Sequence, residues 1–223
     1  MDFQEIIRQL VISALPILIA ITFHEAAHGY VANRLGDPTA RLMGRLTLNP
    51  IAHIDLVGTV IMPLMLLILT NGQFVFGYAK PVPINPANFN NPKKDMAISA
   101  AAGPLSNISL AFLSMLILKF LVFPLASLMP DTMSRGFATP MSLMLMQSIK
   151  WNVVLAVFNM IPVPPLDGGR VMVGLLPHRQ AISYSRIEPY GMIIVIILIM
   201  SGIARFFIYP IMSLLLSLIT LFL

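Results

Sequence analysis

The segment His24-Glu25-Ala26-Ala27-His28 places three ionisable side chains within an apolar stretch of the chain. Residues four apart on a helix project from the same face, so His24 and His28 can bind one metal ion together. Imidazole nitrogens are common zinc ligands, and a glutamate beside them can act as general base toward water that the metal activates. The spacing therefore predicts a hydrolytic zinc site, and the apolar surroundings place it inside a membrane.

The alternative for this segment is a chance pattern on a structural helix. A charged side chain at the centre of a membrane helix costs about 3 kcal/mol on insertion scales, so Glu25 without a function would be costly. Metal binding by His24 and His28, with Glu25 beside the activated water, is therefore the better interpretation.

A hydrolytic zinc site needs three protein ligands and an open position for water. Cysteine is absent from the chain, so any metal must be bound by nitrogen and oxygen ligands. Asp167 is the best candidate for the third ligand, because prolines break the apolar segment before it and free the backbone to bend. The alternative for Asp167 is a turn or a helix cap, which the following Gly168-Gly169 also favours.

The composition indicates an integral membrane protein. Of the 223 residues, 57% are hydrophobic and 10% are charged, and the mean hydropathy is +0.86, whereas about 25% of residues are charged in a soluble domain. The formal charge of +5 comes from basic residues in loops beside apolar segments, which indicates orientation in a membrane rather than nucleic-acid binding. We expect a single membrane domain over residues 1–223, with residues 1–20 retained rather than cleaved as a signal peptide.

The apolar segments predict an all-helical polytopic fold with about six membrane segments. They cover residues 6–33, 56–70, 96–128, 141–160 and 190–223. The last of them is long enough for two helices, with a break marked by Ser201-Gly202, Arg205 and Pro210. The segment at residues 56–70 is short for a span, and we favour a re-entrant element, because all the basic loops can then face the cytoplasm.

Residues 73–85 alternate aromatic and small residues and then contain prolines, which predicts a small extended β element at the membrane. A scissile amide within a transmembrane helix is enclosed, and its carbonyl is already hydrogen-bonded, so a substrate must unwind before it is cut. An unwound substrate can pair with this segment as an added strand. We therefore expect Tyr78, Lys80 and Pro81 to bind substrate or to support the site.

Together these motifs resemble the site-2 protease family of intramembrane zinc metalloproteases in its minimal form. Three motifs match in order over nearly the whole length of the chain, namely residues 24–28, Ala102-Gly103-Pro104 with Asn107, and Asn159 to Gly169. The stretch from Gly77 to Pro83 also resembles a segment of the family. The resemblance implies one zinc ion per chain, held by His24, His28 and Asp167. It also implies that Glu25 is the general base and that Asn159 lies near the reacting carbonyl.

The resemblance further implies a protease that cuts a transmembrane protein in or near the bilayer, as in regulated intramembrane proteolysis. We expect the cytoplasmic membrane of a prokaryote as its location, the bilayer and a transmembrane substrate as partners, no nucleic-acid partner, and no PDZ or nucleotide-binding regulatory domain. Two other classes remain open, a catalytically silent relative that binds membrane proteins and a metal transporter. The intact Glu25 argues against the first, and the few acidic residues in the apolar helices argue against the second.

Three polar residues have both a functional and a structural interpretation. Asn159 can lie near the reacting carbonyl or satisfy backbone groups that Pro162 frees. Asn107 can support the site or join two helices by a hydrogen bond. His53, in a loop with Asp55, can be a ligand at the rim of the site, a proton relay or part of a capping pair, and we favour a structural role for it.

Overall fold

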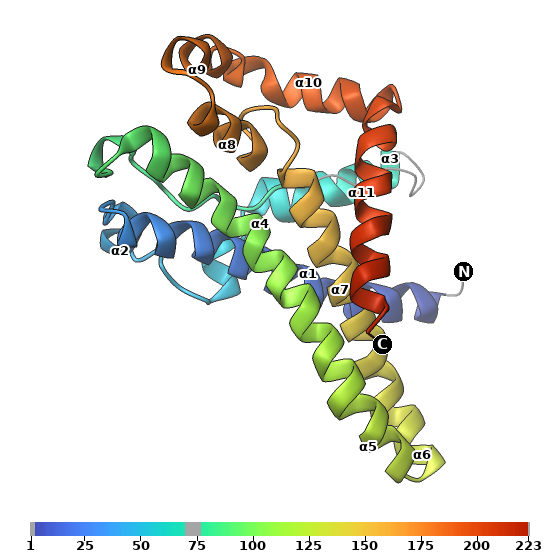
Figure 1. The fold of residues 1–223 in the computed structure, drawn as a ribbon. Coiled ribbons are helices and arrows are strands. Elements are labelled where there is room, and N and C mark those ends of the chain that lie inside the picture. The colour runs from blue at the N-terminus through green and yellow to red at the C-terminus, as the bar shows by residue number, and fades with distance from the viewer. Residues whose placement is uncertain (1–2, 70–76, 223) are drawn as a thin grey trace.

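The computed structural model of this chain describes residues 3–69 and 77–222, and over these residues its regular structure is entirely helical (Figure 1). The α-helices are α1 (Phe3–Arg34), α2 (Thr39–Leu42), α3 (Met62–Leu69), α4 (Pro92–Ile117), α5 (Phe123–Leu128), α6 (Asp131–Met133), α7 (Thr139–Asn159), α8 (Asp167–Leu175), α9 (His178–Ser185), α10 (Glu188–Met200) and α11 (Ile203–Thr220). The shorter 3-10 and π segments are η1 (Pro50–His53), η2 (Leu56–Ile61), η3 (Pro86–Asn88), η4 (Leu118–Val122) and η5 (Ser134–Ala138).

The helices α1, α4 and α7 pack against one another and form the centre of the molecule (Figure 1). Asn91 begins α4 by accepting a hydrogen bond from the Lys94 N–H, and Pro92 occupies the first helical position, where its missing N–H costs nothing. The helix continues through η4 and α5, and after a turn at Met129-Pro130 the chain returns through α6, η5 and α7 as a long hairpin.

Small and aliphatic side chains fill the interface of this hairpin with α11. The buried cluster consists of Ala111, Met115, Ile149, Val153, Val157 and Ile219. Because α1 also packs on both α4 and α7, the central helices fix one another's positions, and any polar group between them must find its partner within the bundle.

Four helices are long and apolar enough to cross a membrane, and a fifth span results if α9 and α10, which are bent by 69°, count as one. The expectation of about six membrane segments is therefore not confirmed. The predicted break at Ser201-Gly202 is present, and Gly202 has the positive φ of 75° that the turn between α10 and α11 requires. Pro210, expected at that break, instead lies inside α11.

The short apolar segment after the first helix forms η2 and α3, which together are about 20 Å long at 1.5 Å per residue. This length is less than the hydrocarbon thickness of about 30 Å. Asp55 begins the segment by accepting a hydrogen bond from the Gly58 N–H at 2.7 Å. Its re-entrant placement in the membrane stays a prediction.

The β element expected at residues 73–85 is not confirmed. Residues 73–76 lie outside the described part of the chain, and residues 77–85 are irregular, with no strand assigned. The physical reason lies in the hydrogen bonds of this stretch, because the N–H groups of Tyr78 and Lys80 bond to carbonyls of two different elements, at Gly58 and His53, rather than to one partner strand.

Candidate metal centre

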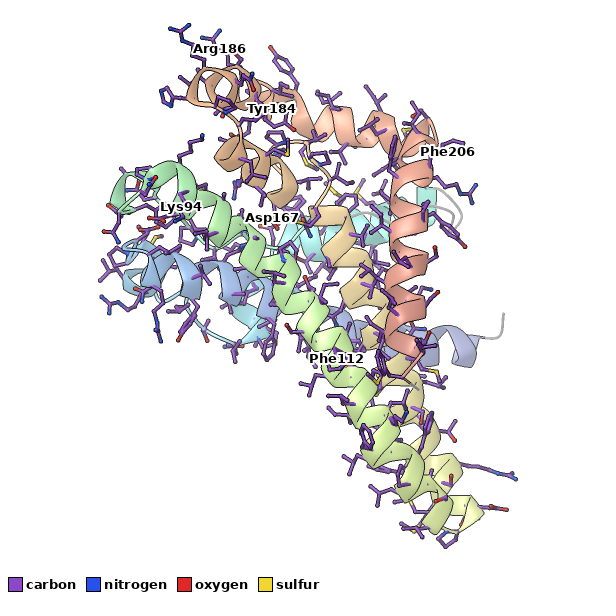
Figure 2. All side chains as sticks on the ribbon, in the orientation of Figure 1. Lys94, Phe112, Asp167, Tyr184, Arg186 and Phe206 are labelled. Atoms are coloured by element: carbon purple, nitrogen blue, oxygen red, sulfur yellow. The ribbon has the colours of Figure 1, made fainter. Side chains whose placement is uncertain are left out.

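The structure brings His24, His28 and Asp167 together, each of them buried, with their possible ligand atoms within 4.8 Å of one another. The two Nε2 atoms of the histidines are 3.1 Å apart, and Oδ2 of Asp167 lies 3.2 Å from the first and 3.3 Å from the second. Figure 2 shows Asp167 between α8 and α4. Two segments separated by most of the chain therefore converge on one point.

Each imidazole is oriented through its other nitrogen. Nδ1 of His24 lies 2.6 Å from Oδ1 of Asn107, and Nδ1 of His28 lies 2.7 Å from the carbonyl oxygen of Ser99. Both partners are acceptors, so Nδ1 carries the proton in each ring, and in the neutral imidazole Nε2 then presents a lone pair. Ser99 also donates its hydroxyl to the carbonyl of His28, so α1 and α4 are joined twice at this residue.

The Asn107 side chain is fixed by two further hydrogen bonds. Its Nδ2 donates to the carbonyl of Ala20 at 3.1 Å and to Oδ1 of Asn152 at 2.8 Å, and both asparagines are fully buried. Of these residues, Asn107 was predicted from the sequence, whereas Asn152 and Ser99 were not. A signal for Asn152 existed, since an amide in an apolar segment needs a partner, but the partner could not be read from the sequence.

Gly103 explains why α4 can approach the histidines so closely. A Cβ atom added at this position would lie 2.7 Å from Cε1 of His24 and closer still to Nε2 of His28. The glycine of the Ala102-Gly103-Pro104 motif therefore leaves the space beside the imidazoles that a side chain would occupy.

Asp167 is placed by the irregular segment between α7 and α8, residues 160–166, and by the two glycines that follow Asp167. Cβ atoms on Gly168 and Gly169 would collide with backbone atoms of Met160 and Pro164 respectively. The prolines end α7, and the glycines let the start of α8 fold back against the segment. The expected bend that returns the carboxylate to the histidines is thus present.

Glu25 is half-buried and follows His24 directly on α1. Its Oε2 accepts a hydrogen bond from the N–H of Val82 at 2.7 Å, while no described residue donates to its Oε1. Val82 is buried and packs over Gly29, the residue after His28. The stretch at residues 77–85 therefore contacts α1 directly at its functional motif.

The remaining predicted residues lie outside the group of three. Nδ2 of Asn159, at the end of α7, donates to the carbonyl of Leu155 at 3.0 Å. His53 is buried in η1, where Nε2 donates to the carbonyl of Thr47 at 2.9 Å and Nδ1 has no partner among the described residues. The structure thus places His53 in a packed loop, away from the group of three.

Tyr78, Lys80 and Pro81 hold the irregular stretch against the loops before it. The ring of Tyr78 lies directly over Gly58, where a Cβ would overlap the ring atoms. The carbonyl oxygens of Lys80 and Pro81 both accept hydrogen bonds from the Arg45 guanidinium, at 2.9 and 3.4 Å. These contacts are structural, and none of them involves the group of three.

The group of three fits a zinc ion. Oδ2 of Asp167 lies within 3.3 Å of both histidines, and this buried oxygen has no hydrogen-bond partner among the described residues. In the neutral imidazoles with Nδ1 protonated, Nε2 has no proton to donate to it. Three lone-pair atoms thus face one another, an arrangement that a cation relieves. Two imidazole nitrogens and one carboxylate oxygen are an ordinary zinc ligand set with a fourth position left for water.

Comparisons with known proteins agree with this chemistry. The family model described as "Peptidase family M50" matches residues 126–202, which include Asn159 and Asp167. A Bacillus subtilis protein named "Putative zinc metalloprotease YwhC" is 36% identical over 197 residues, 88% of this chain and 84% of that protein. A Mycolicibacterium smegmatis protein named "Putative zinc metalloprotease Rip2" is 24% identical over 189 residues, 82% of this chain and 64% of that protein. No solved structure gives a significant match.

Proposed function

Because this chain belongs to peptidase family M50, the site-2 protease family of membrane zinc metalloproteases, we propose that it hydrolyses a peptide bond in or beside a transmembrane segment of another protein. The observation that carries this proposal is the convergence of His24, His28 and Asp167 with both Nδ1 protons already engaged. These three residues hold one zinc ion per chain. A zinc ion bound there supplies Lewis acidity and lowers the pKa of water to about 7.

Glu25 is the general base in this proposal. Its Oε2 is engaged by the Val82 N–H, so Oε1 is the atom that takes the proton from the attacking water. The same carboxyl group then returns that proton to the leaving amine. The Val82 contact already fixes the direction of the carboxylate. Little conformational entropy of the Glu25 side chain is therefore lost when the substrate binds.

Asn159 binds the reacting carbonyl in this proposal. One proton of its amide is donated to the Leu155 carbonyl, so the second proton is available to donate to the substrate oxygen as negative charge develops there. Its position at the end of α7, directly before the segment that leads to Asp167, supports this assignment.

The substrate binds as an extended strand along residues 77–83. The N–H groups of Tyr78, Lys80 and Val82 are used within the protein, and alternate residues of an extended chain point to opposite edges. The other edge contains Pro81 and Pro83, which have no N–H, and the Pro81 carbonyl already accepts from Arg45. This edge therefore offers the N–H of Ala79 and the carbonyls of Ala79 and Pro83. We expect Ala79→Pro, which removes that donor, to raise the KM for substrate, and an unchanged KM would contradict this binding mode.

The location and the biological role are part of the same proposal. Four helices of spanning length and the family assignment make this an integral membrane protein. We propose the cytoplasmic membrane of a prokaryote as its location, a transmembrane protein as its substrate, and regulated intramembrane proteolysis as its role.

The proposal is tested by cleavage of a panel of transmembrane peptides in lipid with zinc added. Replacing Glu25 by Gln should reduce cleavage at least about a hundredfold, because general-base catalysis is lost, while bound zinc is retained. The control is Glu188→Gln, which changes a carboxylate at the start of α10 and should leave cleavage unchanged. Equal cleavage by wild type and Glu25→Gln would contradict the proposal, as would zinc flux into sealed vesicles without peptide cleavage.

A further inference from the structure

Two buried asparagines link the three central helices to one imidazole. Asn152 lies on α7, Asn107 on α4 and His24 on α1. Oδ1 of Asn152 accepts from Nδ2 of Asn107 at 2.8 Å, and Oδ1 of Asn107 accepts from Nδ1 of His24 at 2.6 Å. A continuous chain of hydrogen bonds therefore runs across the bundle and ends at a metal ligand.

The direction of every hydrogen bond in this chain is set by backbone carbonyls. Nδ2 of Asn152 donates to the carbonyl of Ser148 at 2.9 Å, so its oxygen must face Asn107. Nδ2 of Asn107 then meets two acceptors, the carbonyl of Ala20 and Oδ1 of Asn152. The oxygen of Asn107 is left to face His24, whose Nδ1 must be the protonated nitrogen.

We propose that Asn152 is a positioning residue for the metal ligand His24, and that it acts through Asn107. This inference rests on the proposed function, because it assigns a role in zinc binding. By presenting an acceptor to Nδ2 of Asn107, Asn152 holds His24 in the tautomer whose Nε2 is free to bind zinc. A reversed Asn107 amide would protonate His24 at Nε2, directly where the metal binds.

A purely structural role for Asn152 predicts something different. Hydrogen bonds between membrane helices commonly join helices without any effect on a site. The chain offers a comparison, since Ser114 on α4 and Ser148 on α7 share a hydrogen bond of 2.8 Å. The Ser148 hydroxyl also accepts from Nδ2 of Asn152 at 3.2 Å, but Ser114 itself has no hydrogen bond to either asparagine among the described residues. If Asn152 only joins α4 to α7, its loss should resemble the loss of Ser114.

The test is zinc affinity of the purified protein in lipid, measured by competition with a chelator. Asn152→Leu should weaken zinc binding about tenfold, the low end of what outer partners of metal-bound histidines contribute. Asp in place of Asn152 keeps an acceptor for Asn107, so Asn152→Asp should bind zinc within about twofold of wild type. Ser114→Ala, the control, should bind zinc as wild type does.

A double-variant comparison shows whether Asn152 acts through Asn107. Asn107→Leu alone should weaken zinc binding more than Asn152→Leu, and the combined variant should be no weaker than Asn107→Leu. Losses that add in the combined variant would overturn the inference. The d–d spectrum of the Co²⁺-loaded protein should change in Asn152→Leu and stay unchanged in Ser114→Ala.

The outcomes separate this inference from the proposed function. A wild-type protein that binds no zinc would contradict the proposed function itself. Zinc binding by wild type together with unchanged affinity in Asn152→Leu, or with the same small loss in Asn152→Leu and Ser114→Ala, would overturn only the role of Asn152. If Asn152→Leu does not fold, Asn152→Ala removes the same acceptor with a smaller side chain, and its zinc affinity is judged by the same criteria, alone and combined with Asn107→Leu.

Discussion

The two sides of the metal centre are held in different ways. The histidines lie on α1 inside the helical bundle, where each ring is fixed by a hydrogen bond from Nδ1 to α4. Asp167 begins α8 after an irregular segment at residues 160–166, and its Oδ2 has no hydrogen-bond donor among the described residues. The bundle therefore orients its ligands without a metal, whereas the carboxylate is oriented by close backbone packing and depends on a cation for its partner.

This difference indicates which part of the fold a bound metal ion stabilises. In the bundle, the energetic cost of orienting the imidazoles is met by buried hydrogen bonds that exist already. On the other side, the Asp167 carboxylate faces the two imidazole nitrogens without a hydrogen-bond donor among the described residues, so this is the side of the site that a bound cation stabilises.

The largest effect is expected from Asp167→Ala, which removes the ligand that the segment supplies. Zinc affinity should fall more than about a hundredfold, because two imidazoles remain where three ligands are needed. The measurement is zinc content after dialysis against a weak chelator. Asp131→Ala, which removes a carboxylate at the far end of the helical hairpin, is the control, and equal zinc content in the two variants would contradict the comparison.

A somewhat smaller effect is expected from Gly103→Ala on the bundle side. The added Cβ would lie 2.7 Å from Cε1 of His24, so α4 must move away from α1. Overpacking of this kind costs about 1–3 kcal/mol, and we expect zinc affinity to fall about tenfold or more. Gly136→Ala, at a position with open space around it, should change neither thermal stability nor zinc affinity.

Removing the metal should affect the two sides of the site differently. After chelation, amide hydrogen exchange measured in lipid should accelerate at residues 160–170 by about tenfold, while exchange in α4 near Asn107 stays the same. The reason is that the α4 hydrogen bonds to the histidines do not involve the metal. Equal acceleration in both regions would show that zinc organises the bundle as well, and the comparison would fail.

The smallest effect on the site is expected from Asp37, which lies in the loop after α1 and is fully buried. Burial raises its pKa, but hydrogen bonds from Thr39, Asn88 and Asn85 outweigh that effect, so the pKa of Asp37 lies below its ordinary value. A carboxylate with a lowered folded pKa stabilises the fold above its unfolded pKa of about 3.9, and this stabilisation is lost as the pH falls through the folded pKa.

Asp37→Asn should therefore lower the free energy of unfolding at pH 7 by about 1–3 kcal/mol and should flatten the acid limb of the stability curve. Zinc affinity should not change, because none of the hydrogen bonds of Asp37 reaches either side of the metal centre. Thermal unfolding from pH 3 to pH 7, with zinc titration at pH 7, checks both statements. A change in zinc affinity would couple this loop to the site.

The local parts of the site could be predicted from the sequence. The spacing of His24 and His28 fixes their shared helix face, and the prolines before Asp167 mark the bend that returns the carboxylate. The break at Ser201-Gly202 is equally local, since a glycine with positive φ is needed there. Each of these signals lies within a few residues of the feature that it predicts.

The rest depended on contacts between distant residues. The partners of the imidazoles, Asn107, Asn152 and Ser99, lie on helices whose packing no short motif specifies. The predicted β element at residues 73–85 required a partner strand, and the described residues of that stretch bond instead to single carbonyls of different loops. Likewise, the composition of α10 is that of a membrane-spanning helix. Its 13 residues are only about 20 Å long, however, which is less than the hydrocarbon thickness of about 30 Å.

The central claim is that one zinc ion is held by two imidazoles of the bundle and one carboxylate of the segment. X-ray absorption spectroscopy of the zinc-loaded wild-type protein in lipid tests this claim most directly. We expect one zinc ion per chain, with two nitrogen ligands of imidazole type and oxygen ligands that include a carboxylate. A protein that takes up no zinc, or zinc with fewer than two imidazole ligands, would contradict the account.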